Sequence, residues 1–301
     1  MSEIFDSSFL NKLQNIAVSS RISVSGGMGG NRKSRSKGSS VEFSDYREYA
    51  TGDDFRRIDW NAYGKFEKLF LKLFMEEREA PINIMLDTSA SMNFGEPGKS
   101  VASRRLAAAL SFIALANYDR LGLYGLTDKA TPQGETLRGR YTFPKILNFL
   151  ENISYEGTTN LLNAIKGCKI SSDRGVTILI SDMFSQAAST STSTTSAKAY
   201  SASLEEAIKY LRYRKQDVYL CHVLSPQEID PELDSDMRLI DSETGDFRDI
   251  AASSFVTEAY RKVFKEYTHE LEGVCTANGA WYMLLPTTIP IEEMIRKVVE
   301  V

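Results

Sequence analysis

The amino-acid sequence predicts an α/β protein with a doubly wound, mostly parallel sheet. Apolar runs with the length of buried strands alternate with stretches of helical periodicity over residues 82–299, which is typical of a sheet with helices on both faces. Of the 301 residues, 42% are hydrophobic and 25% are charged, as in ordinary globular proteins. Acidic and hydroxyl residues follow directly on two of the apolar runs. Ligands of such sheets bind at the carboxyl ends of strands.

The predicted strands and helices follow one another regularly from residue 82 onwards. The patterns predict strands at 82–86, 121–126, 176–181, 218–224 and 281–285. They predict helices at 101–117, 144–150, 161–168, 204–214, 254–278 and 291–299. Each strand is therefore followed by helical sequence, which parallel pairing requires.

Three segments depart from this alternation. Side chains alternate between two faces at 66–75, which predicts an antiparallel edge strand joined by a hairpin to the strand at 82–86. A turn-rich link at 242–246 predicts an inserted β-hairpin over 237–250. The Ser/Thr-rich stretch at 185–203 has little apolar surface to bury, so we expect a flexible insert there.

We expect two domains, an N-terminal segment over 1–65 and an α/β domain over 66–301. Apolar residues at helical spacing after Asp6 and Ser7 predict a short amphipathic helix that docks on the body. Residues 26–38 are basic and rich in glycine, which is typical of a loop. The mixed charges between Arg47 and Asp59, next to Trp60, favour a salt-bridged clasp that fastens this segment to the domain, with a docking surface as the alternative.

Composition excludes several classes of function. The net charge of -4 argues against nucleic-acid binding through a basic surface. The basic stretch at 26–38 favours a solvated loop, with binding of nucleic acid or of an acidic partner surface as the alternative. Three scattered cysteines and two histidines, His222 and His269, support neither a disulfide framework nor a zinc site. There is no apolar run long enough to span a membrane and no signal-peptide pattern. We therefore expect a cytoplasmic protein.

Candidate ligand residues come from three separate loops. Asp87, Ser89 and Ser91 follow the apolar run at 82–86, Thr159 lies in a polar turn that opens a helix, and Asp182 follows the run at 176–181. Carboxylate and hydroxyl oxygens suit a hard cation such as Mg²⁺. The alternative for Asp87, Ser89 and Ser91 is a turn that caps the next helix through local hydrogen bonds.

Gly98, Lys99 and Ser100 imitate the end of a phosphate-binding loop. The full pattern requires glycine where Asn93 stands, and the loop is too long to cradle a phosphate at the strand end. We therefore expect Lys99 and Ser100 only to open the helix.

The three loops together resemble the metal ion-dependent adhesion site of the von Willebrand factor A fold. That motif has Asp-x-Ser-x-Ser on one loop, Thr on a second and Asp on a third, which correspond here to Asp87, Ser89, Ser91, Thr159 and Asp182. Met183 stands where many such domains have glycine. The chain also resembles the family called domain of unknown function 58, often found with MoxR-type AAA+ ATPases, through Arg47, Glu48, Tyr49, Gly52, Asp53, Arg56, Ile58, Asp59 and Trp60.

The resemblance implies a Mg²⁺ or Mn²⁺ ion whose coordination is completed by an acidic side chain of a partner protein. The expected function is therefore metal-dependent protein binding, as an adaptor or assembly factor acting with a MoxR-type ATPase and without catalysis. The alternative is a Mg²⁺-dependent hydrolase or phosphatase with Asp87 as nucleophile. That chemistry needs a further acid or base, and the sequence places no histidine next to the three loops.

Overall fold

The computed structural model describes residues 4–19, 42–75, 80–127, 130–132, 136–184, 194–231, 237–240, 247–250 and 254–300. The chain forms two compact units. Unit 1 combines Met1–Val24 with Ala80–Val301, and unit 2 is Ser25–Glu79. The sequence suggested one boundary, after residue 65. The two units instead have boundaries after residues 24 and 79, because unit 2 is inserted in the sequence of unit 1.

Unit 1 is built on a six-stranded sheet. In chain order its strands are β3 (Pro81–Asp87), β4 (Arg120–Leu126), β5 (Ala130–Pro132), β6 (Gly175–Ser181), β7 (Gln216–Leu224) and β10 (Trp281–Pro286). They lie in the order β10-β7-β6-β3-β4-β5, and all neighbours pair in parallel except β5, which is antiparallel to β4. The doubly wound, mostly parallel sheet is thereby confirmed. The chain passes from β3 to β4 on one side and then to β6 on the other, so the winding reverses at β3.

The antiparallel edge strand is β5 and not the segment 66–75. Within that segment, β2 (Phe70–Met75) pairs with β1 (Glu42–Glu48) in a separate two-stranded sheet of unit 2. Residue 66 ends a helix, α2 (Trp60–Phe66). That helix begins because the Asp59 carboxylate accepts hydrogen bonds from the backbone N–H groups of Asn61 and Ala62. The alternating pattern was read correctly as a strand only over its second half.

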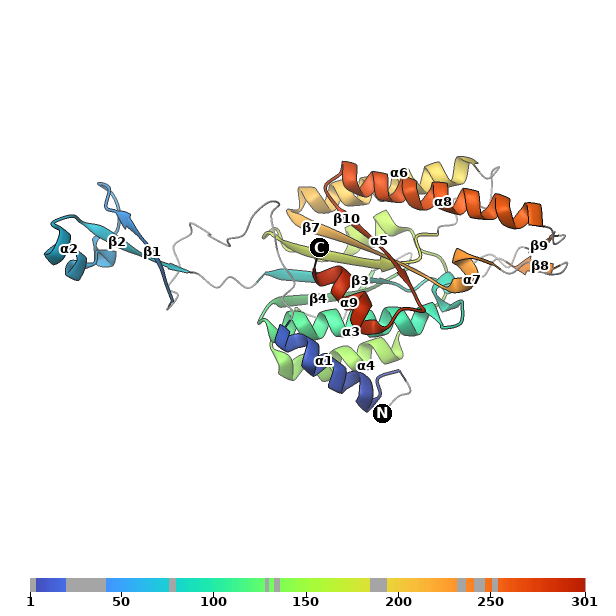
Figure 1. Ribbon diagram of the computed structural model, residues 1–301, viewed down its shortest axis with the longest axis horizontal. Helices are drawn as coiled ribbons and strands as arrows, with labels where there is room; N and C mark the ends of the chain where they lie inside the picture. Colours follow the sequence, from blue (N-terminus) through green and yellow to red (C-terminus); the bar gives the residue numbers. More distant parts are fainter. Residues whose placement is uncertain are drawn as a thin grey trace. The chain divides into compact units, whose positions relative to one another are not determined.

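Helices cover both faces of the sheet in unit 1 (Figure 1). On one face lie α1 (Ser7–Ser19), α3 (Lys99–Ala116), α4 (Phe143–Asn152) and α9 (Ile291–Val299). On the other lie α5 (Leu161–Gly167), α6 (Thr194–Tyr213) and α8 (Ser254–Ala277). The remaining pieces are short: η1 (Phe55–Arg57), η2 (Ala90–Asn93), η3 (Arg140–Thr142), α7 (Pro226–Ile229), β8 (Met237–Ile240) and β9 (Phe247–Ile250).

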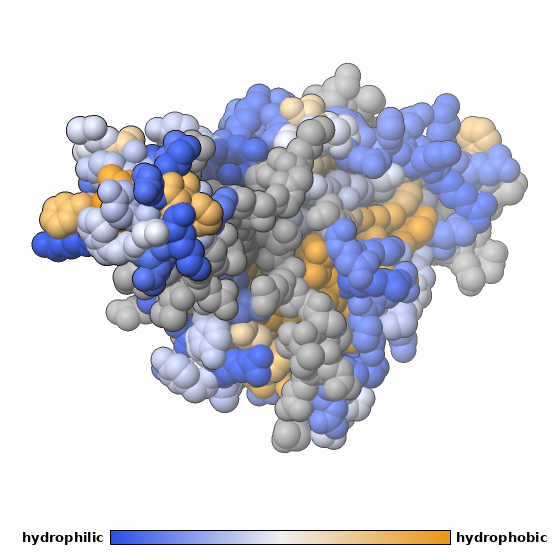
Figure 2. Space-filling view, turned by 60° about the vertical axis from the view of Figure 1, so that its left-hand side comes forward, coloured by the Kyte–Doolittle hydropathy of each residue, from blue (hydrophilic) through white to orange (hydrophobic). Residues whose placement is uncertain are grey.

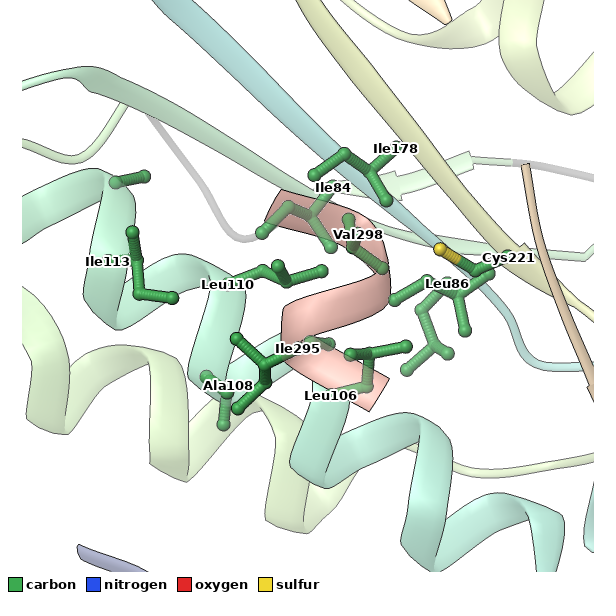
Figure 3. Packing of buried hydrophobic residues seen from close by; sticks show 14 of the residues in the cluster. Ile84, Leu86, Leu106, Ala108, Leu110, Ile113, Ile178, Cys221, Ile295 and Val298 are labelled. Atoms are coloured by element: carbon green, nitrogen blue, oxygen red, sulfur yellow. The ribbon is translucent and has the colours of Figure 1, made fainter. Parts of the chain in front are cut away.

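Alternate side chains of the central strands enter the two cores. Ile84 and Leu86 of β3 lie in the core under α3, whereas Met85 between them lies in the core under α5 and α6. Figure 3 shows Ile84 and Ile178 from neighbouring strands packed with Leu110 of α3 and Val298 of α9. Because both faces are covered, β3 is buried along its whole length, which explains its continuous apolar run.

The amphipathic helix expected near the N-terminus is confirmed as α1. It begins with a hydrogen bond from the backbone N–H of Phe9 to the Asp6 carboxylate (2.9 Å). Its buried side chains Phe9 and Leu13 join the core on the α3 face. Arg105 of α3 fastens the start of the segment by donating to the Ile4 carbonyl oxygen (2.8 Å). The basic loop at 26–38 lies outside the described residues.

The two predicted inserts differ in outcome. β8 and β9 pair antiparallel, which confirms the hairpin at 237–250. In the Ser/Thr-rich stretch, 185–193 lies outside the described residues, but 194–203 is the first half of α6. Leu204, Ile208 and Leu211 bury one face of this helix. Because the second half of α6 is packed and alanine favours helix, the helix extends towards its N-terminus into the stretch that the sequence analysis assigned to an insert.

The surface carries hydrophobic residues among hydrophilic ones (Figure 2). Within unit 2 the side chains of Trp60, Phe55 and Phe66 are each more than 60% exposed. Trp60 is therefore not buried in its own unit, although the sequence suggested an apolar anchor. In the part of the chain that the structure describes, none of the helices combines the length and the apolar character that crossing a membrane requires.

Phe9 tests the contribution of α1 to unit 1. Phe9→Ala removes a ring that is 2% exposed and packs beside Arg105, so we expect the free energy of unfolding to fall by about 3 kcal/mol. Urea denaturation measures the change. The exposed Asn11 of the same helix gives a matched control, because Asn11→Ala should leave stability unchanged or slightly higher. Equal stability of both variants would show that α1 does not belong to the core.

Candidate metal centre

The two predicted carboxylates lie at the carboxyl ends of two neighbouring strands, where the winding of the sheet reverses. Leu86 of β3 pairs with Ile180 of β6, so the residues that come next meet at the carboxyl edge of the sheet. There the Ser181 hydroxyl donates to Asp87 Oδ2 (2.6 Å). Asp87 is the last residue of β3, and Asp182 directly follows β6. This edge is where doubly wound sheets bind ligands.

The loop after β3 is hydrogen-bonded to Asp87 through its backbone. The backbone N–H of Ser89 donates to Asp87 Oδ1 (3.0 Å), and Ser89 then becomes the N-cap of η2. Ser91 in η2 places its Oγ 3.0 Å from Ser89 Oγ. The local hydrogen bond considered above is thus present between Asp87 and Ser89, but the Ser89 side chain makes no cap hydrogen bond to η2.

A second loop brings Thr159 to the same carboxylate. Its hydroxyl donates to Asp87 Oδ1 (2.6 Å). Two backbone hydrogen bonds hold the loops together, from Glu156 N to Thr88 O (3.0 Å) and from Ala90 N to Gly157 O (3.0 Å). Gly157 has φ +71°, a conformation that glycine adopts without steric cost. Four of the five predicted residues, Asp87, Ser89, Ser91 and Thr159, are therefore linked to one another by hydrogen bonds.

The carboxylate of Asp87 is buried without a positive partner among the described residues. It is 2% exposed, and its hydrogen bonds come from two hydroxyls and one backbone N–H. Burial, followed by the charge of Asp182, raises the pKa of Asp87 above its usual range, although these hydrogen bonds act in the opposite direction. Its negative charge is therefore only partly compensated.

Asp182 has a different environment because a lysine reaches it from α3. Lys99 Nζ lies 2.7 Å from Asp182 Oδ2 and 2.5 Å from Glu228 Oε1. The side chains of Lys99 and Asp182 are completely buried. Burial alone would lower the pKa of Lys99, but the charges of Asp182 and Glu228 outweigh it and raise the pKa. The sequence suggested that Lys99 only opens a helix. The structure shows that it also pairs with two carboxylates.

A histidine also lies beside the third loop, which the sequence did not suggest. His222 of β7 is fully buried, with Nε2 2.8 Å from the Asp182 carbonyl oxygen and Nδ1 2.6 Å from the Tyr282 hydroxyl. Burial lowers the pKa of His222 to about 4, although the charge of Asp182 acts in the opposite direction. A neutral ring that donates from Nε2 and accepts at Nδ1 satisfies both contacts. Both nitrogens are therefore engaged in holding the backbone after β6.

Met183 directly follows Asp182 on the third predicted loop. Its φ of 56° is left-handed, which is uncommon for a residue with a side chain. The side chain is completely buried in the core under α5 and α6, and the backbone N–H donates to Ser181 Oγ (3.0 Å). Packing and this hydrogen bond offset the unfavourable backbone conformation.

The donor set fits a small, hard divalent cation. Neighbouring oxygens on an octahedron around Mg²⁺ lie about 3 Å apart, because each is about 2.1 Å from the ion, and Ser89 Oγ and Ser91 Oγ are 3.0 Å apart. The described residues contain no cluster of three His, Cys, Asp or Glu side chains suited to a metal. A cation here would consequently depend on hydroxyl oxygens and on two buried carboxylates, Asp87 and Asp182, of which Asp182 is paired with Lys99.

Sequence reasoning missed Ser181, Lys99 and Glu228. Ser181 had a signal, because it ends the same strand that Asp182 follows. Glu228 lies in the capping box Ser225-x-x-Glu228, in which the glutamate accepts the backbone N–H of Ser225 (2.9 Å). The sequence predicts such a box, but not that the other carboxylate oxygen holds Lys99.

The charged segment before β2 stabilises unit 2 itself. Arg47 pairs with Asp53 (2.7 Å), and Asp59 pairs with Lys72 (3.2 Å) and accepts from the Tyr46 hydroxyl (2.8 Å). These contacts are internal to unit 2. The clasp between the N-terminal segment and the α/β domain stays a prediction, as does the docking surface.

His222 gives a test of this geometry by NMR. We expect its ring to stay neutral, with the proton on Nε2, down to about pH 4, because burial disfavours the charged ring. The unfolded chain takes up this proton at about pH 6.5. His222 therefore lowers the free energy of unfolding as the pH falls from about 6.5 towards 4. Ring ¹⁵N shifts measure the titration, and His269→Asn assigns the two histidine signals. Protonation of His222 near pH 6.5 would contradict the buried contacts.

Known proteins resemble this chain in structure at low sequence identity. The conserved hypothetical protein BatB from Bacteroides thetaiotaomicron is 16% identical, with a TM-score of 0.40, over 74% of this chain and 100% of that chain. An aerotolerance-related membrane protein from Bacteroides fragilis is 14% identical, with a TM-score of 0.42, over 73% and 96%. Proximal thread matrix protein 1 from the mussel byssus is 11% identical, with a TM-score of 0.43, over 74% and 45%.

No curated protein matches the sequence. A protein family does match, and it covers residues 45–271, which is most of the chain and includes all five predicted ligands. Its description is "Protein of unknown function DUF58". The chain therefore belongs to the DUF58 family.

Proposed function

We propose that this protein binds partner proteins through a divalent cation held by Asp87, Ser89, Ser91 and Thr159, with Asp182 beside them. The observation that carries this proposal is the state of Asp87. Its carboxylate is almost completely buried and receives hydroxyl donors, but no positive side chain of the described residues pairs with it. Buried charges in proteins are normally paired or coordinate a metal.

Asp87, Asp182, Glu228 and Lys99 together carry more negative than positive charge. When they are ionised, Asp87, Asp182 and Glu228 contribute three negative charges, and Lys99 contributes one positive charge, which leaves -2. A Mg²⁺ or Mn²⁺ ion would neutralise this charge. Ser91 and Thr159 are only half-buried, so an ion at these hydroxyls would be reachable from solvent.

An ion at this site would keep part of its positive charge available. Three of the four oxygen donors nearest to it are neutral hydroxyls, and both Asp182 oxygens already accept hydrogen bonds, one from Lys99 and one from the backbone N–H of Phe184. Mg²⁺ prefers six oxygen ligands. An acidic side chain of a partner would complete the coordination, and the half-exposed ring of Phe94 beside the loop offers an apolar contact next to it.

The partner that best suits this proposal is a MoxR-type AAA+ ATPase, for which the protein would act as an adaptor or assembly factor. The support is the motif resemblance described above and membership of the DUF58 family. The alternative, a hydrolase with Asp87 as nucleophile, has weaker support. His222 is buried with both nitrogens engaged, and Lys99 is bound by two carboxylates, so neither side chain is placed for proton transfer to a substrate.

Asp87→Asn separates metal binding from folding. We expect the affinity for Mn²⁺ to fall about 100-fold or more, because the one uncompensated charge is lost. In metal-free buffer the free energy of unfolding should rise by about 1 kcal/mol, because a buried unpaired charge disappears. Calorimetric titration with MnCl₂ and urea denaturation measure the two changes.

Asp217→Asn is the matched control for this variant. Asp217 is also a buried aspartate on a central strand, but it pairs with Arg212 (2.7 Å) and Arg174 (3.6 Å). Its replacement should leave the Mn²⁺ affinity unchanged and lower stability. Unaltered Mn²⁺ binding in Asp87→Asn, or no binding in the unmodified protein, would refute the proposed site.

Binding to the ATPase should depend on the cation. We expect a purified MoxR-type ATPase to bind the immobilised protein in Mg²⁺ and to dissociate in EDTA, because the cation bridges the two proteins. Asp87→Asn should show no binding in either buffer, and Asp217→Asn should behave as the unmodified protein. Binding that persists in EDTA would contradict the bridge, and phosphoester hydrolysis lost in Asp87→Asn would favour the enzyme instead.

A further inference from the structure

Lys99 is a buried positive charge within the candidate metal centre. It is the first residue of α3, and its side chain is completely shielded from solvent. Its ammonium group contacts Asp182 Oδ2 at 2.7 Å and Glu228 Oε1 at 2.5 Å. The three residues come from α3, from the end of β6 and from α7, so they connect three loops at the carboxyl edge of the sheet.

Helix stability does not account for a lysine at this position. The N-terminus of a helix carries a partial positive charge, which disfavours a cation in the first turn. Removing an ammonium group from water is unfavourable unless close anionic partners offset the cost. The placement of Lys99 is therefore explained by its two carboxylates and not by α3.

Glu228 is fixed so that it holds Lys99 in place. Its second oxygen, Oε2, accepts hydrogen bonds from the backbone N–H and from the hydroxyl of Ser225, both at 2.9 Å. The neighbouring Gln227 side chain bonds both the backbone N–H (3.3 Å) and the carbonyl oxygen (3.0 Å) of Glu96, in the loop before α3. These contacts fasten α7 to the loop that leads into Lys99.

The contact with Lys99 determines what Asp182 can offer a metal. Asp182 Oδ2 accepts from Lys99, and Oδ1 accepts from the backbone N–H of Phe184 (3.2 Å). A divalent cation and the ammonium group would therefore share one carboxylate. Each positive charge weakens the attraction of Asp182 for the other.

We propose that Lys99 is an internal competitor of the divalent cation for Asp182 and that it limits how tightly the cation is held. This inference rests on the metal site put forward under Proposed function. With Lys99 present, Asp87 is the only carboxylate of the cluster without a cationic partner. The bound ion consequently keeps more of its charge for the carboxylate of a partner protein.

Competition predicts opposite effects for two neutralising substitutions. Lys99→Met removes the competing charge, so the affinity for Mn²⁺ should rise about tenfold or more. Glu228→Gln removes a negative charge and leaves Lys99 with Asp182 alone, so the affinity should fall about tenfold. A purely structural role would weaken binding in both variants, because each breaks the same buried contact.

The affinity is measured by calorimetric titration of the full chain with MnCl₂. A second titration measures it by EPR, in which the signal of free Mn²⁺ decreases as the ion binds. Lys209→Met is the control, because this exposed lysine pairs only with Glu205 one turn away on α6 in the described structure and should leave the affinity unchanged. If Lys99→Met does not fold, Lys99→Met/Glu228→Gln is compared with Glu228→Gln, and loss of the lysine should again tighten binding about tenfold.

The outcomes separate this inference from the metal site itself. Tighter binding in Lys99→Met and weaker binding in Glu228→Gln support the competition. Unchanged or weaker binding on loss of Lys99, while the unmodified protein binds Mn²⁺, overturns the competition and leaves the metal site intact. If neither the unmodified protein nor Lys99→Met binds Mn²⁺, both the competition and the metal site are overturned.

Discussion

The parallel pairing of β3 with β6 is the constraint on which the rest of the site depends. Parallel strands end at the same edge of a sheet, so the backbone pairing of β3 with β6 brings Asp87 next to Ser181, which lies 94 positions away and donates to it, and next to Asp182, which follows. At this edge the side chains of Asp87, Ser89 and Asp182 are almost completely buried. Each polar group placed there then interacts in a low dielectric, where charges and hydrogen bonds have large effects.

Much of the fold could be predicted from patterns among residues that are close in the sequence. Buried strands such as β3 and β6 are long apolar runs, and helices such as α9 keep strict helical spacing, so their positions agreed with the patterns. β5 has three residues and β1 carries many charges, so neither has a pattern that stands out. The strand partner of β2 was misassigned because register between strands depends on contacts that local sequence does not encode.

The same distinction applies to the candidate site. Its five predicted residues could be named because each follows a recognisable strand or opens a helix. Lys99 could not, because its partners lie 83 and 129 positions away and its own neighbourhood imitates the start of an ordinary helix. His222 was likewise hidden within an apolar strand. Burial and pairing of charged residues are tertiary properties, and they decided which groups remain available for a ligand.

The position of α1 has a consequence for how unit 1 is held together. Fifty-five residues of unit 2 separate α1 from the rest of unit 1, yet Phe5, Phe9 and Leu13 lie in the same core as α3. In effect α1 is a peptide ligand supplied by its own chain. A cut in the connection after α1 would turn an intramolecular contact into fragment complementation, in which the effective concentration provided by the tether is lost. The core on the α3 face would then depend on protein concentration.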